Sequence, residues 1–205
     1  MGLPEGGASR PQSKLPAAWR LPMIIVGIAA VFAFTGESGR EWLRYDRGAI
    51  IDGEYWRMLS GHFVHLGASH YLLNVAGLLL IWYLIGTAFS LTHWLLIAAG
   101  TIAGVDLGFW FFSPGLIWYV GLSGLLHGLL AAGILATLRS QTKEASVLAV
   151  LLVGKLVYEQ FVGPLPGSEG STGGTVIVDA HLYGAISAAI LASGVLIRVR
   201  TSAPL

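Results

Sequence analysis

Cysteine is absent from the 205-residue sequence, which excludes a disulfide framework and thiolate-bound metals. Charged residues are also few, at 11% of the chain against about 25% in a typical soluble domain. The net charge of +1 provides no basic surface for a nucleic-acid partner. Hydrophobic residues make up 55% of the sequence, so the composition predicts a protein whose main solvent is lipid.

Six apolar runs occupy most of the chain and predict an all-α membrane protein with six transmembrane helices. They are Leu21–Phe34, His70–Ile85, Leu91–Phe112, Trp118–Leu138, Ser146–Val162 and Val176–Ile197. We interpret residues 1–20, which are rich in Pro, Gly and Ser, as a disordered cytoplasmic tail, and residues 21–200 as a single six-helix membrane domain. Because a span needs about 20 residues, the shorter runs favour a thinned bilayer or helices that begin beside a water-filled cavity.

The orientation of the spans follows from the basic residues, which favour the cytoplasmic side. The tail, the connection at residues 139–143 and the segment after residue 197 are basic, and six spans place them on one side. The long first loop has four basic residues against five acidic ones. The first run also has the character of a secretory signal peptide, but its end lacks a clear small-x-small cleavage site and further spans follow. We therefore predict cytoplasmic termini.

Polar residues inside spans are costly and are often functional. His70 and Asn74 in the second span, Ser123 in the fourth and His181 in the sixth each lie within about two turns of the non-cytoplasmic end of their span. Four polar groups from three helices are thus predicted to meet at one depth. His70 and Asn74 are spaced i, i+4 and therefore share one helix face.

A serine and a histidine in such a cluster favour nucleophilic catalysis, because a neighbouring base activates the serine hydroxyl. A stripe of small residues beneath the histidine allows its helix to approach another helix closely. The stripe consists of Gly184, Ala185, Ala188 and Ala192. Gly121 and Gly124 flank Ser123 and leave room for a substrate carbonyl. Asn74, His70 and the serine backbone N–H are the candidate donors to an oxyanion.

Three further polar side chains in the spans have simpler interpretations. His127 lies one turn below Ser123 and is a rival base by spacing, but its deeper position suits packing better than proton transfer. Lys155 and Glu159 are spaced i, i+4 and are predicted to neutralise each other.

The remaining candidates are assigned structural parts. Asp179 lies roughly 160° from His181 around a helix, so it suits the helix N-terminus better than a catalytic triad. Asp106 lies in the third span without a partner that the sequence identifies. The histidines in or near loops are interpreted as structural: His62, His65 and His93.

Four motifs in order along the chain resemble those of the rhomboid family of intramembrane serine proteases. Trp56-Arg57-x-x-Ser60-x-x-Phe63-x-His65 resembles the first-loop signature, and His70-x-x-x-Asn74 resembles HxxxN. Residues 121–124 (Gly-Leu-Ser-Gly) resemble GxSG, and residues 180–184 (Ala-His-Leu-Tyr-Gly) resemble AHxxG.

The resemblance implies a dyad of Ser123 and His181 without an aspartate, and an oxyanion site at Asn74 and His70. It also implies a six-helix core with the site open to the outer side, transmembrane protein substrates, and no metal or other cofactor. Supporting positions are Gly121, Gly124, Gly184, Trp56 and Arg57.

Within that family, residues 121–128 and 178–184 look most like the rhombosortase branch. This implies a bacterial inner-membrane enzyme, open to the periplasm, that cleaves exported proteins ending in a Gly-Gly motif, a hydrophobic helix and a basic tail. Two positions bear on the branch: Ala188 replaces a glycine that family members often have, and His127 is absent from most other rhomboids.

Three other functions compete with proteolysis. A catalytically silent rhomboid-like protein would bind membrane clients, but such proteins typically lose one member of the intact Ser123–His181 pair. A haem protein needs facing histidines, which the spacing does not supply, and a transporter would place polar groups near the midplane.

The Gly-rich segment 163–175 is interpreted as a mobile cap on the site, with an inert linker as the alternative.

Overall fold

The structure, a computed structural model, describes residues 19–201, with side chains up to residue 198. The tail predicted at residues 1–20 lies outside this range except for its last two positions. The long helices are α1 (Arg20–Ala33), α5 (Ala68–Ile85), α6 (Leu91–Phe112), α7 (Ser123–Thr137), α8 (Thr142–Phe161) and α10 (Val178–Thr201). The short elements are α2 (Gly36–Leu43), β1 (Tyr45–Asp46), α3 (Arg47–Ile51), α4 (Trp56–Ser60), β2 (Trp118–Tyr119) and α9 (Ser168–Thr172).

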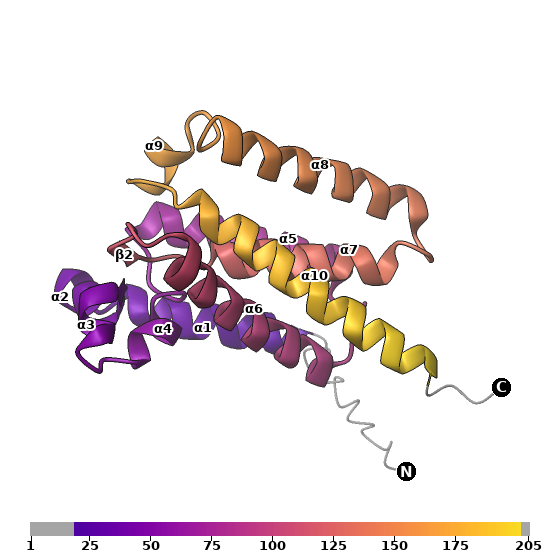
Figure 1. Cartoon of the computed structure of the whole chain (residues 1–205), viewed down its shortest axis with the longest axis horizontal. Helices are drawn as coiled ribbons and strands as arrows, with labels where there is room; N and C mark the ends of the chain where they lie inside the picture. Colours follow the sequence, from indigo (N-terminus) through magenta and orange to yellow (C-terminus); the bar gives the residue numbers. More distant parts are fainter. Residues whose placement is uncertain (1–18, 202–205) are drawn as a thin grey trace, which may run out of the picture.

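The long helices form a bundle, and the short elements gather at one end of it (Figure 1). Most residues of α7 are buried, whereas α8 lies along an outer side of the bundle and exposes most of its apolar side chains. An outward apolar surface is costly in water but suits lipid, where hydrocarbon chains cover it. The arrangement therefore agrees with an all-α membrane protein.

The number of spans is tested by helix length and composition. Among the described residues, α5, α6 and α10 are long and apolar enough to cross a membrane. The pair α1 and α2, bent by 118° at a short break, adds a fourth candidate, and α7 is a shorter apolar helix. The six predicted apolar runs each coincide with a long helix, but six complete crossings stay a prediction.

The fourth predicted run begins too early. Trp118 and Tyr119 form β2, which pairs antiparallel with β1, and the helix starts only at Ser123. Gly121 lies between the strand and the helix with a φ of +131°, a backbone conformation that residues other than glycine rarely adopt. Because α7 begins later than predicted, Ser123 is its first residue.

The first long loop is held by Arg57, which is buried. Its guanidinium donates to the backbone oxygens of Glu41 and Arg44 at 2.7 and 3.1 Å, and it forms an ion pair with Glu54. The neighbouring Trp56 ring lies 5.4 Å from the ring of Trp42. These contacts hold α4 against α2 and so fix the path of the loop.

The backbones of α7 and α10 are in contact, and Gly184 of the small-residue stripe predicted to allow close approach lies in this contact. A Cβ atom at Gly184 would collide with the carbonyl oxygen of Gly124, and one at Gly128 would lie 2.8 Å from the carbonyl oxygen of Gly184. Because backbone atoms cannot rotate away as a flexible side chain does, these glycines set the distance between the two helices.

The substitution Gly184→Ala is expected to destabilise the protein by about 1–3 kcal/mol, the usual cost of overpacking. Gly194→Ala on the same helix is the matched control, because no atom lies within 4 Å of its Cβ position. The control is expected to be neutral or slightly stabilising, since alanine favours a helix. Unfolding of the purified variants in detergent measures both effects, and equal stability of the two would contradict the tight contact.

Candidate active site

Ser123 is positioned by the turn that precedes α7. The backbone N–H of Gly121 donates to the carbonyl of Gly61 at 3.1 Å, and the carbonyl of Gly121 accepts from the hydroxyl of Tyr119. Burial raises the pKa of Tyr119, so this hydroxyl keeps its proton and remains a donor. A Cβ at Gly121 would lie 3.0 Å from the His70 ring, so glycine is needed there for space as well as for φ.

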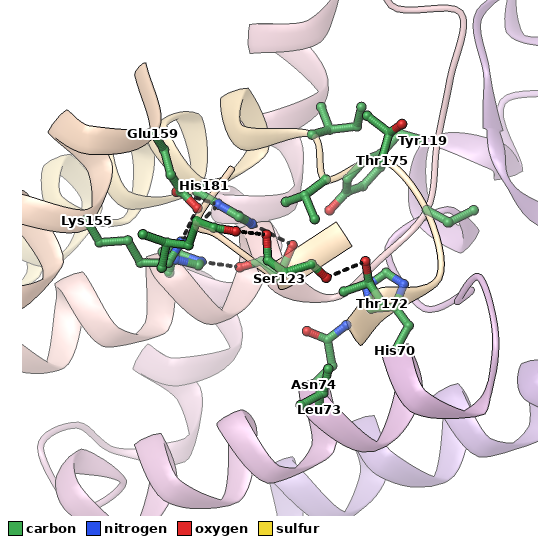
Figure 2. Close-up of a pocket in the computed structure, with 16 residues that line it drawn as sticks. His70, Leu73, Asn74, Tyr119, Ser123, Lys155, Glu159, Thr172, Thr175 and His181 are labelled. Carbon is green, nitrogen blue, oxygen red and sulfur yellow. Dashed lines mark hydrogen bonds and ion pairs between the residues drawn. The ribbon is translucent and has the colours of Figure 1, made fainter. Parts of the chain in front are cut away.

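His181 lies in the first turn of α10 and faces Ser123 (Figure 2). Its Nε2 is 3.0 Å from the Ser123 Oγ, which is hydrogen-bonding distance for transfer of the hydroxyl proton. The imidazole is buried, with 4% of the residue exposed, so few alternative orientations are open to it. The pair predicted from the sequence is therefore in contact. It lies beside the glycine seam, the close contact of α7 and α10 at Gly124, Gly128 and Gly184.

The other ring nitrogen of His181 contacts a carboxylate on α8. Nδ1 lies 2.8 Å from Oε2 of Glu159, whose second oxygen accepts from the ammonium of Lys155 at 2.5 Å. The sequence predicted the Lys155–Glu159 pair, and the structure contains it. That pair accounts for only one carboxylate oxygen, and the contact of the other with His181 was missed.

His127 contacts the same histidine from below. The two rings stack with centroids 4.0 Å apart and an interplanar angle of 16°. The Nδ1 of His127 bonds to the backbone carbonyl of Ser123 at 2.7 Å rather than to its hydroxyl. This geometry agrees with the packing role expected of His127 and does not suit a general base for Ser123.

His127, Glu159 and His181 each offer a nitrogen or oxygen atom within 4.8 Å of the other two, which is the spacing of ligands around a metal ion. Two features oppose it. The in-plane lone pairs of stacked, nearly parallel rings do not converge on one point, and the ammonium of Lys155 already occupies one carboxylate oxygen. A cation there would face another positive charge.

Asn74 and His70 reach the site from α5, on the opposite side of Ser123 (Figure 2). Asn74 is 6% exposed, and its Nδ2 is among the few buried side-chain atoms of the described residues without a hydrogen-bond partner. An unpartnered buried donor is costly, so its presence in a cavity beside Ser123 favours a ligand oxygen as its partner.

His70 presents its Nε2 to the same region. Its Nδ1 accepts from the backbone N–H of Leu66 at 3.4 Å, which leaves the proton on Nε2, near Gly121. The His65 ring packs edge-on against His70 with centroids 5.0 Å apart. Burial, with a smaller contribution from His70, lowers the pKa of His65 to about 3, so this supporting ring is neutral.

One cavity of about 190 Å³ is lined by Ser123, His181, Glu159, Asn74 and His70. The walls come from α5, α7, α8 and α10, together with the segment that contains α9. Leu165, Ser168, Thr172 and Thr175 of that segment line the cavity, so the Gly-rich stretch lies over the site. Whether it moves stays a prediction.

Two acids that the sequence singled out, the buried Asp106 and the partly buried Asp179, lie outside this cavity. Asp106, for which the sequence identified no partner, lies 3.2 Å from Nε2 of the fully buried His62. Asp179 accepts from the hydroxyl of Ser113 at 2.6 Å in the first turn of α10, which agrees with the part expected at a helix N-terminus. Neither acid is a third member of the Ser123–His181 pair.

The chain matches a known protein family. The family model described as "Rhomboid domain" matches residues 52–198, which is most of the chain and includes all of the residues placed at the cavity. A search of curated proteins found no significant match.

Proposed function

The chain belongs to the rhomboid family, and from that membership we propose that it is an intramembrane serine endopeptidase with Ser123 as nucleophile and His181 as general base. The observation that carries the proposal is the 3.0 Å contact between Ser123 Oγ and His181 Nε2 inside a cavity. A catalytically silent relative would need neither this contact nor a vacant polar donor beside it.

The chemistry follows from the positions of the groups. Ser123 Oγ attacks the substrate carbonyl while its proton passes to His181 Nε2, and the new oxyanion accepts from Asn74 Nδ2 and His70 Nε2–H. The protonated His181 then donates to the leaving amine as the peptide bond breaks. Water attacks the acyl-enzyme, with His181 again taking and returning the proton, and Ser123 is regenerated.

The substrates are proposed to be exported proteins with a Gly-Gly motif, one hydrophobic helix and a basic tail. The support is the likeness of residues 121–128 and 178–184 to the rhombosortase branch, together with the size of the cavity. A volume of about 190 Å³ suits residues with little side chain on either side of the cut bond. Glycine also lets a substrate helix unwind, because it lowers helix stability by about 1 kcal/mol relative to alanine.

A membrane cleavage assay tests this substrate class. A reporter carrying Gly-Gly, a hydrophobic helix and a basic tail is expected to be cut by the wild type, and an otherwise identical Leu-Leu reporter at least about 10-fold more slowly. If a generic rhomboid reporter is cut and the Gly-Gly reporter is not, the chain is a protease but its assignment to the rhombosortase branch is wrong. If neither reporter is cut, the silent client-binding protein becomes the better explanation.

A further inference from the structure

We propose that Glu159 is a positioning residue that holds His181 with its proton on Nδ1, so that Nε2 is free to accept the proton of Ser123. The inference rests on the proposed function, and it adds a third group to a pair that the family resemblance describes without one. Glu159 acts through His181, since its carboxylate contacts the far nitrogen of the ring (Figure 2).

The distances assign the tautomer. Nδ1 of His181 has two neighbours, Glu159 Oε2 at 2.8 Å and the ammonium of Lys155 at 3.3 Å. One nitrogen serves only one of them, because Lys155 needs an acceptor and the carboxylate needs a donor. The carboxylate is nearer and makes the charge-assisted bond, so Nδ1 carries the hydrogen. Nε2 is then the acceptor that the Ser123 hydroxyl requires.

The burial of Glu159 indicates that this contact is not incidental. The residue is 3% exposed on a helix of mostly apolar residues, and an unpaired carboxylate is strongly disfavoured when it is buried. A surface ion pair with Lys155 would not require burial. The carboxylate is instead held between the ammonium and the imidazole, where it stabilises the imidazolium that forms when Ser123 gives up its proton.

Lys155 determines what a neutral replacement at position 159 can do. In Glu159→Gln, the amide oxygen must face Lys155, because an ammonium offers only donors. The amide NH₂ then faces His181 and donates to Nδ1, which moves the imidazole hydrogen to Nε2. That tautomer cannot accept the serine proton. Removing the lysine as well lets the amide rotate and present its oxygen to Nδ1.

Cleavage kinetics of four purified variants test this inference: Glu159→Gln, Lys155→Met, the double variant, and Gln160→Ala as an exposed control on the same helix. We expect Glu159→Gln to lower kcat at least 10-fold with little change in KM, and the double variant to recover a measurable part of that loss. Because removing the lysine also removes an unpaired charge, kcat is compared among variants that unfold alike in detergent. The contrary outcome is a double variant no faster than Glu159→Gln. That outcome, in variants that remain folded, overturns the inference.

Nitrogen NMR of histidine-labelled protein provides a readout that does not depend on cleavage. The hydrogen of neutral His181 is expected on Nδ1 in the wild type and on Nε2 in Glu159→Gln. A wild type with the hydrogen on Nε2 overturns the inference even if the protein is an active protease. If the NMR shifts are as expected but the protein cuts no reporter, Glu159 does position the His181 hydrogen and the proposed protease function is wrong.

Discussion

Alanine at Ser123 or at His181 is expected to reduce cleavage by roughly 10⁴- to 10⁶-fold, because these two groups act as one unit. The reason is the geometry of the pair: the hydroxyl has no other base at hydrogen-bonding distance among the described side chains, and His181 Nε2 is 3.0 Å away. Combining the two substitutions is expected to cost little more than either alone. Rates of reporter cleavage in membranes, single and double variants side by side, measure this.

The control for this result is His127, the nearest other imidazole. His127→Phe keeps a flat ring against His181 but removes both ring nitrogens, so activity is expected to stay within about 10-fold of the wild type. If His127→Phe were as inactive as His181→Ala while remaining folded, the assignment of the base would be wrong. Full activity of Ser123→Ala would remove the proposed nucleophile.

Replacing Asn74 by alanine is expected to lower kcat by about 10²- to 10³-fold with KM nearly unchanged, as loss of one oxyanion donor does elsewhere. The Nδ2 atom is buried and lacks a partner in the described structure, so it is free to bind an oxygen that becomes charged only during the reaction. An interaction made in the transition state affects kcat rather than substrate binding. Steady-state kinetics with a soluble substrate segment in detergent separates the two constants.

Asn74→Asp is the matched comparison, because the side chain has the same size but offers an acceptor in place of the donor. Its carboxylate would repel the oxyanion, so activity is expected at or below that of Asn74→Ala. Activity near that of the wild type in either variant would assign the oxyanion to other groups, such as His70 and the backbone N–H of Ser123.

Much of the site could be predicted from the sequence, because membrane helices constrain depth. Ser123, His181, Asn74 and His70 each lie within two turns of the N-terminal end of their helix, and this position predicted that they meet at one depth. The small-residue stripe at Gly184 indicated which helix faces would touch, and the structure places it against Gly124. Ser123 and His181 are in contact as a result; their catalytic roles remain proposals.

The remaining features depend on tertiary contacts that spacing does not encode. Glu159 was assigned to Lys155 because i, i+4 neighbours are visible in a sequence, whereas His181 is 22 residues away. The clue was present, since a carboxylate inside an apolar run needs more compensation than a partly exposed lysine supplies. Likewise, Trp118 and Tyr119 were taken into a helix because their apolar character does not reveal that Tyr45 and Asp46 pair with them.

The glycine seam between α7 and α10 also has a consequence for the synthesis of the protein. Ser123 leaves the ribosome 58 residues before His181, which at 5–20 residues per second is a delay of roughly 3–12 s. During that interval Ser123 lacks its contact with His181, which forms only when α10 packs onto α7. On the proposed mechanism, a partly made chain therefore cannot cut the nascent membrane proteins beside it, and activity begins with the docking of the last helix.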